Sequence, residues 1–402
     1  MNALMERLYP YPFEKLRELI SASPAPPHKL KRIALSIGEP RHAPPAVVEE
    51  ALRDTTLLRA SLGSYPKTVG TLELRRAAAS WASRRFKLHP STLTAQAHVL
   101  PVCGTREGLF SFAQAIVSPG ADQLVLMPNP FYQIYEGATL LAGAVPRYVP
   151  CVSSNGWAPD FSHVCARDWE RCALLFLCSP GNPSGTVLPI EALGSLIELA
   201  DRHRFVIAAD ECYSEIYADE SKPPVGLLEA CAVLGRHDYR RCIVFHSLSK
   251  RSNMPGLRSG FVAGDAAIIE RYLRYRTYHG CTMPLMTQRI SELAWNDESH
   301  TVANRALYRE KLLAVARVLR RHCDVQIPEG GFYLWLQTPI DDQSFCQRLF
   351  SQYSVTAFPG TYLARTVDGV NPGEGRVRIA LVADADECME AAERIGELLS
   401  GL

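Results

Sequence analysis

The sequence lacks an excess of charge of either sign. Its 43 Lys and Arg residues nearly balance its 42 Asp and Glu residues, which gives a formal net charge of +1. A chain this balanced exerts no bulk electrostatic attraction on nucleic acid or on an anionic membrane surface. The composition therefore indicates a protein that acts on small molecules, with no nucleic acid and no membrane among its partners.

Long apolar runs and paired cysteines are missing as well. No run approaches the roughly 20 residues needed to cross a bilayer, and residues 1–15 mix charges with prolines, unlike a secretory signal. The 12 cysteines are scattered singly, without a C-x-x-C pair, and no H-E-x-x-H occurs. Many, such as Cys178, sit in apolar runs and are typical of reduced, buried thiols. We therefore expect a cytoplasmic protein without a metal site.

Short apolar runs alternate with longer amphipathic stretches between about residues 97 and 265. The runs occupy residues 99–102, 124–127, 174–178, 205–209, 242–245 and 260–263. Continuous apolar strands separated by helices are typical of a mostly parallel sheet that is covered on both faces. With 402 residues and 47% hydrophobic content, the chain can form such an α/β large domain and a second, smaller one.

The pattern changes after about residue 278. Residues 286–318 predict one or two long amphipathic helices, and strand patterns at 332–335 and 377–382 precede a closing helix at 385–399. This α+β pattern predicts a smaller domain, which a strand pattern near the start of the chain should join. We therefore expect a large domain at residues 46–285 and a small domain made of residues 1–45 with 286–402.

The most informative segment surrounds Lys250. It begins where an apolar strand ends, the place at which ligand groups of an open α/β sheet gather. Ser247, Ser249 and Arg258 bracket the lysine. Hydroxyls and a guanidinium suit a phosphate group, while an amine can condense with an aldehyde. Taken alone, the segment is equally typical of a polar surface turn.

Two further segments follow strand patterns. Asn182 lies in a Pro/Gly-rich loop after residues 174–178, and Asp210 and Tyr213 lie at the carboxyl end of residues 205–209. An aspartate there could cap a helix. It could also hold a proton on a buried heteroaromatic nitrogen through a charge-assisted hydrogen bond.

Together these motifs resemble, in residue type and order, the signature of the class I and II aminotransferases of fold type I. The resemblance runs from about Ser36 to the C-terminus. It implies an aspartate-aminotransferase-like α/β fold and pyridoxal 5′-phosphate as cofactor. It also implies transfer of an amino group between an amino acid and a 2-oxo acid.

The resemblance assigns a role to each residue. Lys250 would hold the cofactor as a Schiff base and act as general base, with Asp210 on the pyridine nitrogen. Asn182 and Tyr213 would hydrogen-bond the 3′ oxygen of the ring. The residues assigned to the phosphate are Gly104, Thr105, Arg106, Ser247, Ser249 and Arg258, the first three at an expected helix N-terminus.

Aromatic residues complete the cofactor assignment. Tyr132 matches the aromatic side chain that stacks on the cofactor ring, whereas for Phe131 and Tyr135 we favour core packing. Tyr65 matches a tyrosine that reaches the phosphate of the neighbouring subunit, which implies a homodimer with shared active sites.

The substrate should meet a second set of residues. Arg378 matches the arginine that binds the substrate α-carboxylate, a bidentate task that suits a guanidinium. Arg376, two residues earlier on the same strand face, is a rival. Gly38 resembles the glycine whose backbone meets the same carboxylate, and Asn182 should contact the substrate as well.

Longer stretches at residues 129–137, 212–217, 245–260 and 275–281 resemble proteobacterial N-succinyldiaminopimelate aminotransferases of lysine and cell-wall precursor synthesis. That resemblance implies N-succinyl-LL-2,6-diaminopimelate as amino donor and 2-oxoglutarate as acceptor. Arg41, Arg276 and His279 are candidates for a contact with the distal end of the donor. The alternatives are an aminotransferase of aspartate, aromatic or acetylornithine specificity and a pyridoxal-phosphate-dependent carbon–sulfur lyase.

Overall fold

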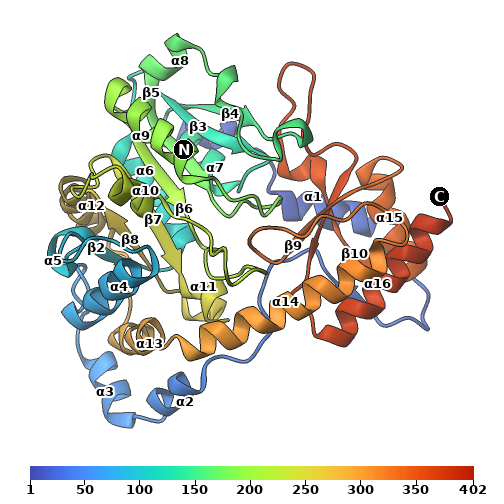
Figure 1. Cartoon of the computed structure of the whole chain (residues 1–402), viewed down its shortest axis with the longest axis horizontal. Helices are drawn as coiled ribbons and strands as arrows, with labels where there is room; N and C mark the ends of the chain where they lie inside the picture. The colour runs from blue at the N-terminus through green and yellow to red at the C-terminus, as the bar shows by residue number, and fades with distance from the viewer.

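Seven strands form one sheet in the computed structural model, which describes residues 1–402 (Figure 1). Their order is β2-β8-β7-β6-β5-β3-β4, and only β8 runs antiparallel to its neighbours. The strands are β2 (Val99–Val102), β3 (Leu124–Asn129), β4 (Val145–Pro150), β5 (Cys172–Cys178), β6 (Val206–Asp210), β7 (Cys242–Ser247) and β8 (Gly260–Gly264). This mostly parallel sheet confirms the predicted α/β class.

Alternate residues of the strands pack into two separate cores. In β7, Cys242 and Val244 join one core, whereas Ile243 and Phe245 join the other. Successive side chains of a strand point to opposite faces, so a strand covered on both faces is apolar throughout. One face is covered by α4 (Leu72–Arg85), α9 (Ile190–His203), α10 (Leu227–Val233) and α13 (Leu285–Asn296), the other by α6 (Thr105–Ile116), α7 (Ile134–Leu141) and α12 (Ala266–His279).

Helix α13 belongs to the large domain. Its residues Ile290, Ala294 and Trp295 are buried in the same core as β7 and α4. The boundary predicted between residues 285 and 286 therefore falls one helix too early. The amphipathic pattern of α13 does not reveal which core its apolar face meets, because α14 (Ser299–Leu319) continues the same pattern after a break of only two residues.

The small domain contains two short sheets and a layer of helices. Strands β11, β12 and β9 form an antiparallel sheet, and β1 pairs in parallel with β10. Its elements are β1 (Ile33–Ala34), β9 (Tyr333–Gln337), β10 (Val355–Thr356), β11 (Phe358–Pro359), β12 (Arg376–Ala380), α15 (Asp342–Tyr353) and α16 (Ala385–Ser400). Pairing of β1 with β10 places Ile33 and Ala34 in this domain. Helix α14 runs from the large domain into the small one (Figure 1).

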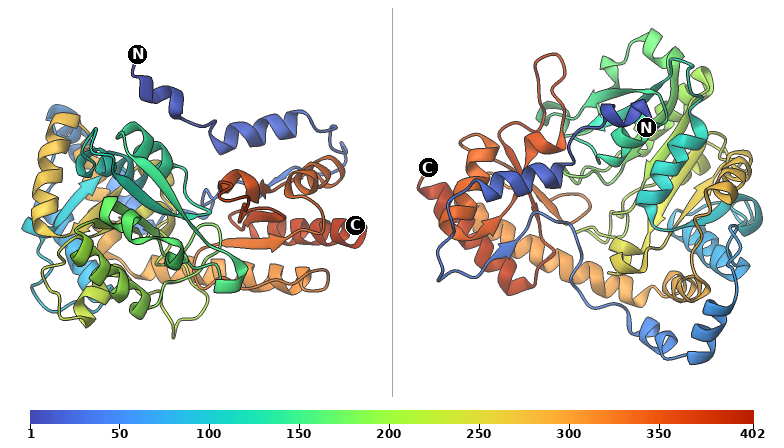
Figure 2. Two further views of the ribbon diagram at one scale, coloured as in Figure 1. Left: turned by 90° about the horizontal axis from the view of Figure 1, so that it is seen from above. Right: turned by 180° about the vertical axis from the view of Figure 1, so that it is seen from behind.

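Residues 3–21 form a strap that spans both domains. It contains η1 (Ala3–Arg7) and α1 (Pro12–Ser21), and Figure 2 shows it lying across the two domains. Leu16 of α1 packs on Phe358 and Leu363 of the small domain, while η1 contacts α7 of the large domain. We call residues 3–21 the N-terminal strap.

The remaining elements are short. They are α2 (Ala46–Leu52), α3 (Thr55–Gly63), α5 (Ala95–His98), α8 (Ala166–Arg171), α11 (Leu248–Arg251), η2 (Ser153–Asn155), η3 (Phe161–His163), η4 (Pro255–Leu257) and η5 (Gly360–Leu363). No helix combines the length and the apolar character that a membrane crossing requires.

Candidate active site

A cavity of about 390 Å³ opens where β5, β6 and β7 end, between the large domain, the small domain and the N-terminal strap. Twelve of the fourteen predicted site residues line it: Gly38, Thr105, Arg106, Tyr132, Asn182, Asp210, Tyr213, Ser247, Ser249, Lys250, Arg258 and Arg378. Gly104 directly precedes Thr105. Tyr65 lies elsewhere and is fully exposed.

Lys250 extends into this cavity from α11, a single helical turn that follows β7 directly. Its Nζ donates a hydrogen bond to the carbonyl oxygen of Gly38. Burial lowers the pKa of the Lys250 amine from 10.5 to about 8, with the nearby Arg378 and Arg258 acting in the same direction. A buried amine with this pKa is partly neutral near pH 7 and can act as a nucleophile or a base.

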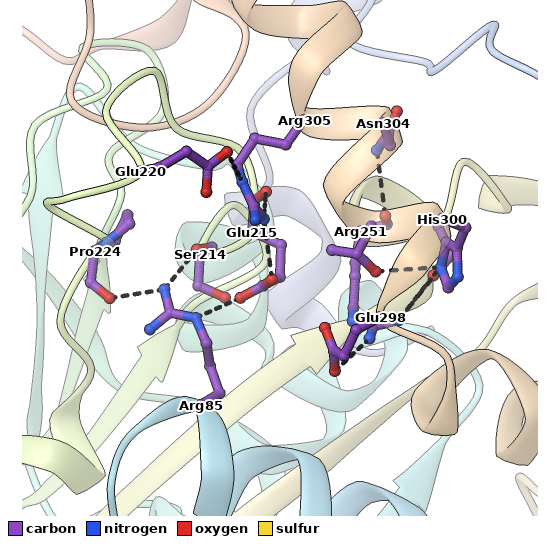
Figure 3. Close-up of polar contacts among 12 residues, drawn as sticks. Arg85, Ser214, Glu215, Glu220, Pro224, Arg251, Glu298, His300, Asn304 and Arg305 are labelled. Carbon is purple, nitrogen blue, oxygen red and sulfur yellow. Dashed lines mark hydrogen bonds and ion pairs between the residues drawn. The ribbon is translucent and has the colours of Figure 1, made fainter.

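The backbone of Lys250 is held by a polar network that includes Asn304, and Figure 3 shows Asn304 with Arg251 and Glu298. The Asn304 side chain of α14 donates to the carbonyl oxygens of Lys250 and Arg251, both at 3.2 Å. The buried Arg251 donates to the carbonyl of Ala294 at 2.7 Å and pairs with Glu298 at 3.1 Å. Arg251 is not evident from the sequence, because its partners lie more than forty residues further along the chain.

A separate polar network holds the segment that follows Tyr213 (Figure 3). The buried Glu215 pairs with Arg85 of α4 at 2.5 Å and with Arg305 of α14 at 3.4 Å. Arg305 also pairs with the half-exposed Glu220 at 2.8 Å. One carboxylate therefore compensates two nearly buried guanidinium groups and connects three elements of the chain.

Asp210 is the last residue of β6 and is held by two donors. The Tyr135 hydroxyl donates to its Oδ2 at 2.9 Å, and the backbone N–H of Cys212 donates to its Oδ1 at 3.3 Å. Burial raises the pKa of the Asp210 carboxyl. A cationic ring nitrogen facing Asp210 would stabilise the carboxylate. Tyr135 stacks on Phe176 in the core, as expected, and also orients Asp210, which the sequence did not indicate.

A group of donors faces the other end of the cavity. The Ser247 side chain accepts a hydrogen bond from the Ser249 N–H at 3.1 Å, and both serines line the cavity with Arg258 and Thr105. Gly104 has φ +81°, and a Cβ there would lie 2.2 Å from Nη2 of Arg258. Glycine is therefore required where the arginine crosses the N-terminus of α6. Hydroxyls, a guanidinium and a helix N-terminus together suit a phosphate group.

Arg378 enters the cavity from β12 and is buried. Its Nη1 donates to the Asn182 side-chain oxygen at 3.0 Å and its Nη2 to the Ser36 carbonyl at 2.8 Å, while its Nε has no hydrogen-bond partner. The rival Arg376 stacks on the Trp157 ring at 4.2 Å and does not line the cavity. An arginine that is buried without a carboxylate partner is suited to bind one from a ligand.

Gly38 and Tyr333 approach each other closely beside Lys250. A Cβ on Gly38 would lie 1.9 Å from the Tyr333 hydroxyl oxygen, so only glycine fits. That hydroxyl lies 3.0 Å from the hydroxyl of Tyr213. Tyr333 is a second site residue that the sequence analysis missed, since its segment was interpreted only as a strand.

The three residues suggested for the distal end of a substrate lie outside the cavity. Arg41 pairs with Glu387 at 3.3 Å, and Arg276 is buried against Glu107. His279 is exposed in the last turn of α12. Arg106 lines the cavity, and its side chain donates to two tyrosine hydroxyls rather than turning back toward Arg258 and the serines.

Comparison with known proteins agrees with this geometry. The family model described as aminotransferase class I and II matches residues 31–395. The chain belongs to the class I and II aminotransferases. Members of this family use pyridoxal 5′-phosphate. The cavity fits that cofactor, because a buried amine, a buried aspartate and a group of donors suited to a phosphate all line it.

Individual relatives cover nearly all of the aminotransferase. An aminotransferase from Neisseria meningitidis is 46% identical, with a TM-score of 0.94 over 99% of this chain and 100% of that one. An LL-diaminopimelate aminotransferase from Nitratidesulfovibrio vulgaris is 31% identical over 91% of each chain. A structure described as a probable N-succinyldiaminopimelate aminotransferase from Thermus thermophilus is 26% identical, with a TM-score of 0.81 over 96% of this chain and 98% of that one.

Proposed function

We propose that this aminotransferase transfers the amino group of N-succinyl-LL-2,6-diaminopimelate to 2-oxoglutarate, in the cytoplasm and as a step of lysine and diaminopimelate synthesis. The observation that carries this proposal is a cavity whose wall contains Lys250 together with two arginines, Arg378 and Arg106. Both proposed substrates carry more than one carboxylate. Relatives named for LL-diaminopimelate and N-succinyldiaminopimelate support the substrate class.

Each residue of the cavity has a place in this reaction. Bound pyridoxal 5′-phosphate supplies an electron sink for the negative charge that develops when Cα of the amino acid loses its proton. Lys250 would anchor the cofactor and then move that proton as general base. Asp210 would keep the ring nitrogen protonated, with Tyr213 and Asn182 on the phenolic oxygen. Arg378 would hold the α-carboxylate, so that Cα faces the lysine.

The phosphate and the faces of the ring have their own residues in the proposal. Gly104, Thr105, Ser247, Ser249 and Arg258 would bind the phosphate, together with the backbone N–H of Arg106, and Tyr132 would cover the ring. Tyr65 is fully exposed and does not line the cavity of its own chain. This position agrees with a role in the site of a second subunit. The proposal therefore includes a homodimer with shared active sites.

A coupled assay of the holoenzyme tests the substrate. Succinyldiaminopimelate, LL-diaminopimelate, acetylornithine, aspartate and an aromatic amino acid would be compared as donors to 2-oxoglutarate, with Lys250→Ala as the inactive control. We expect the highest kcat/KM for the succinylated donor. A preference for LL-diaminopimelate or for aspartate would contradict the narrower proposal. Release of pyruvate from cystathionine, faster than any transamination, would indicate a lyase.

A further inference from the structure

Arg106 occupies an unusual place among the cavity residues. It lies in the first turn of α6, and its guanidinium is held by two phenols. Nε donates to the Tyr132 hydroxyl at 2.7 Å, and Nη2 donates to the Tyr11 hydroxyl at 3.2 Å. We call Arg106, Tyr11 and Tyr132 the Arg106 cluster.

The hydrogen bonds of the Arg106 cluster leave donor capacity unused. A guanidinium carries five N–H donors, and the two tyrosines accept only two of them. Nη1 makes no hydrogen bond, and no carboxylate lies within ion-pair distance of Arg106. Its position at the N-terminus of a twelve-residue helix further favours an anion. The cluster is therefore an exposed cation without a counter-ion on the wall of the cavity, oriented by two hydrogen bonds.

The location of the cluster indicates which part of a ligand would meet it. Tyr132 is the residue assigned to the cofactor ring, and Arg378 lines the same cavity from the small domain. A substrate held by its α-carboxylate at Arg378 would direct its distal end toward another part of the cavity wall. Tyr11 and Phe13 of the N-terminal strap belong to that wall together with Arg106.

We infer that Arg106, positioned by Tyr11 and Tyr132, binds the distal carboxylate of both substrates and so determines the preference for long dicarboxylic acids. The donor would present its succinyl carboxylate and the acceptor its γ-carboxylate. This inference rests on the proposed function for the identity of the donor only. A fixed guanidinium loses little conformational freedom when it binds a carboxylate, which strengthens a charge-assisted pair.

The cluster also joins the two domains. Arg106 and Tyr132 belong to the large domain, whereas Tyr11 precedes α1, which is packed on Phe358 and Leu363 of the small domain. A carboxylate bound to Arg106 would therefore be enclosed by residues of both domains. A substrate with an uncharged end would leave the guanidinium without a counter-ion and would gain no charge-assisted hydrogen bond there.

A comparison of two amino-group acceptors distinguishes carboxylate binding by Arg106 from a general effect of its substitution on the fold. Arg106→Met would be compared with wild type using 2-oxoglutarate and 2-oxobutyrate, which lacks the second carboxylate. We expect kcat/KM for 2-oxoglutarate to fall roughly 10- to 100-fold and that for 2-oxobutyrate to change less than about 3-fold. Arg17→Met on α1, an exposed arginine that does not line the cavity, is the matched control and should leave both values unchanged.

Two further measurements define the mechanism. Calorimetry should show that glutarate binds the wild-type holoenzyme and binds Arg106→Met at least about 10-fold more weakly. Tyr11→Phe keeps the arginine but removes one of its acceptors, so a smaller loss with 2-oxoglutarate is expected. An equal loss with both acceptors, or unchanged glutarate binding in Arg106→Met, would overturn the inference.

The outcomes also separate this inference from the proposed function. If the wild type ignores succinyldiaminopimelate but Arg106→Met still loses 2-oxoglutarate selectively, the proposed donor is wrong and the role of Arg106 stands. If the wild type uses succinyldiaminopimelate and Arg106→Met uses it equally well, the role of Arg106 is wrong and the proposed donor stands.

Discussion

The buried amine of Lys250 leads to a quantitative expectation about cofactor attachment. Only the neutral amine attacks an aldehyde, so the rate should follow the fraction of Lys250 that is unprotonated. With a pKa of about 8, roughly 9% of the amine is neutral at pH 7. With the ordinary pKa of 10.5, roughly 0.03% would be neutral. The lowered pKa of Lys250 therefore raises its neutral fraction about 300-fold at pH 7. We expect faster attachment than with an ordinary lysine, by less than this factor, because an amine of lower pKa is also a weaker nucleophile.

Stopped-flow absorbance on the apoenzyme measures this directly. The second-order rate of pyridoxal phosphate attachment would be recorded from pH 7 to pH 10, above the phosphate pKa of about 6. We expect the rate to rise tenfold per pH unit at the lower end, to bend near pH 8 and to be constant above pH 9. A rate that still rises tenfold per unit between pH 9 and pH 10 would refute a lowered pKa for Lys250.

Two variants shift the bend in opposite directions. Arg378 lowers the pKa of Lys250 through its positive charge, whereas Glu39 raises it. Arg378→Met should therefore move the bend to higher pH and Glu39→Gln to lower pH. Both shifts should be smaller than the total displacement from 10.5, because burial is the largest cause. Shifts in the same direction would show that the two variants act through the fold instead of through their charges.

Three other perturbations test the rest of the site. Arg378→Met should lower kcat/KM for every amino donor by roughly 10- to 150-fold, since all share the α-carboxylate; an effect limited to one donor would contradict its role. Mixed dimers of Tyr65→Ala with Lys250→Ala should regain activity that neither parent has, because one site of each mixed dimer would be complete; no recovery would argue against shared sites. Glu215→Gln should destabilise the protein by about 3 kcal/mol, since the nearly buried Arg85 loses its only carboxylate and Arg305 loses one of its two. The control Glu220→Gln should cost less than about 1 kcal/mol, because Glu220 is half-exposed; equal shifts of the urea midpoint would contradict this.

The sequence predicted the central sheet well, because strands buried on both faces are apolar throughout. The predicted runs lie in β2, β3, β5, β6, β7 and β8, with differences of one or two residues at their ends. It missed β4, an edge strand with two prolines and a partly exposed pattern, which resembles a loop. The domain boundary was placed early for a different reason: α13 has an ordinary amphipathic pattern, and only packing decides which domain it joins.

Residues on local motifs were predicted to share one site and most of them line one cavity, whereas residues with distant partners were not predicted. Lys250 and Asp210 each follow a strand and stand beside other residues of their motif, so the chain order reveals them. Tyr333 meets Tyr213 across 120 positions, and Arg251 finds its partners on α13 and α14. Pairings at such separations leave no periodic signal in a single sequence. Arg41, Arg276 and His279, which were suggested for the distal end of the substrate, lie outside the cavity. The sequence could not exclude them, because a charged residue type does not indicate the direction in which its side chain points.

The groups assigned to the cofactor and those assigned to the ends of the substrate lie on different elements of the fold. The groups assigned to the cofactor come mostly from the ends of strands and from α6 and α11, which the two large-domain cores hold rigidly. The groups assigned to the ends of the substrate, Arg378 and the Arg106 cluster, depend on β12 and on the N-terminal strap. Changes in the strap should therefore alter which substrate is accepted and leave cofactor attachment intact. A Tyr11→Phe variant that lost 2-oxoglutarate selectivity but attached pyridoxal phosphate at the wild-type rate would demonstrate that separation, and equal damage to both would contradict it.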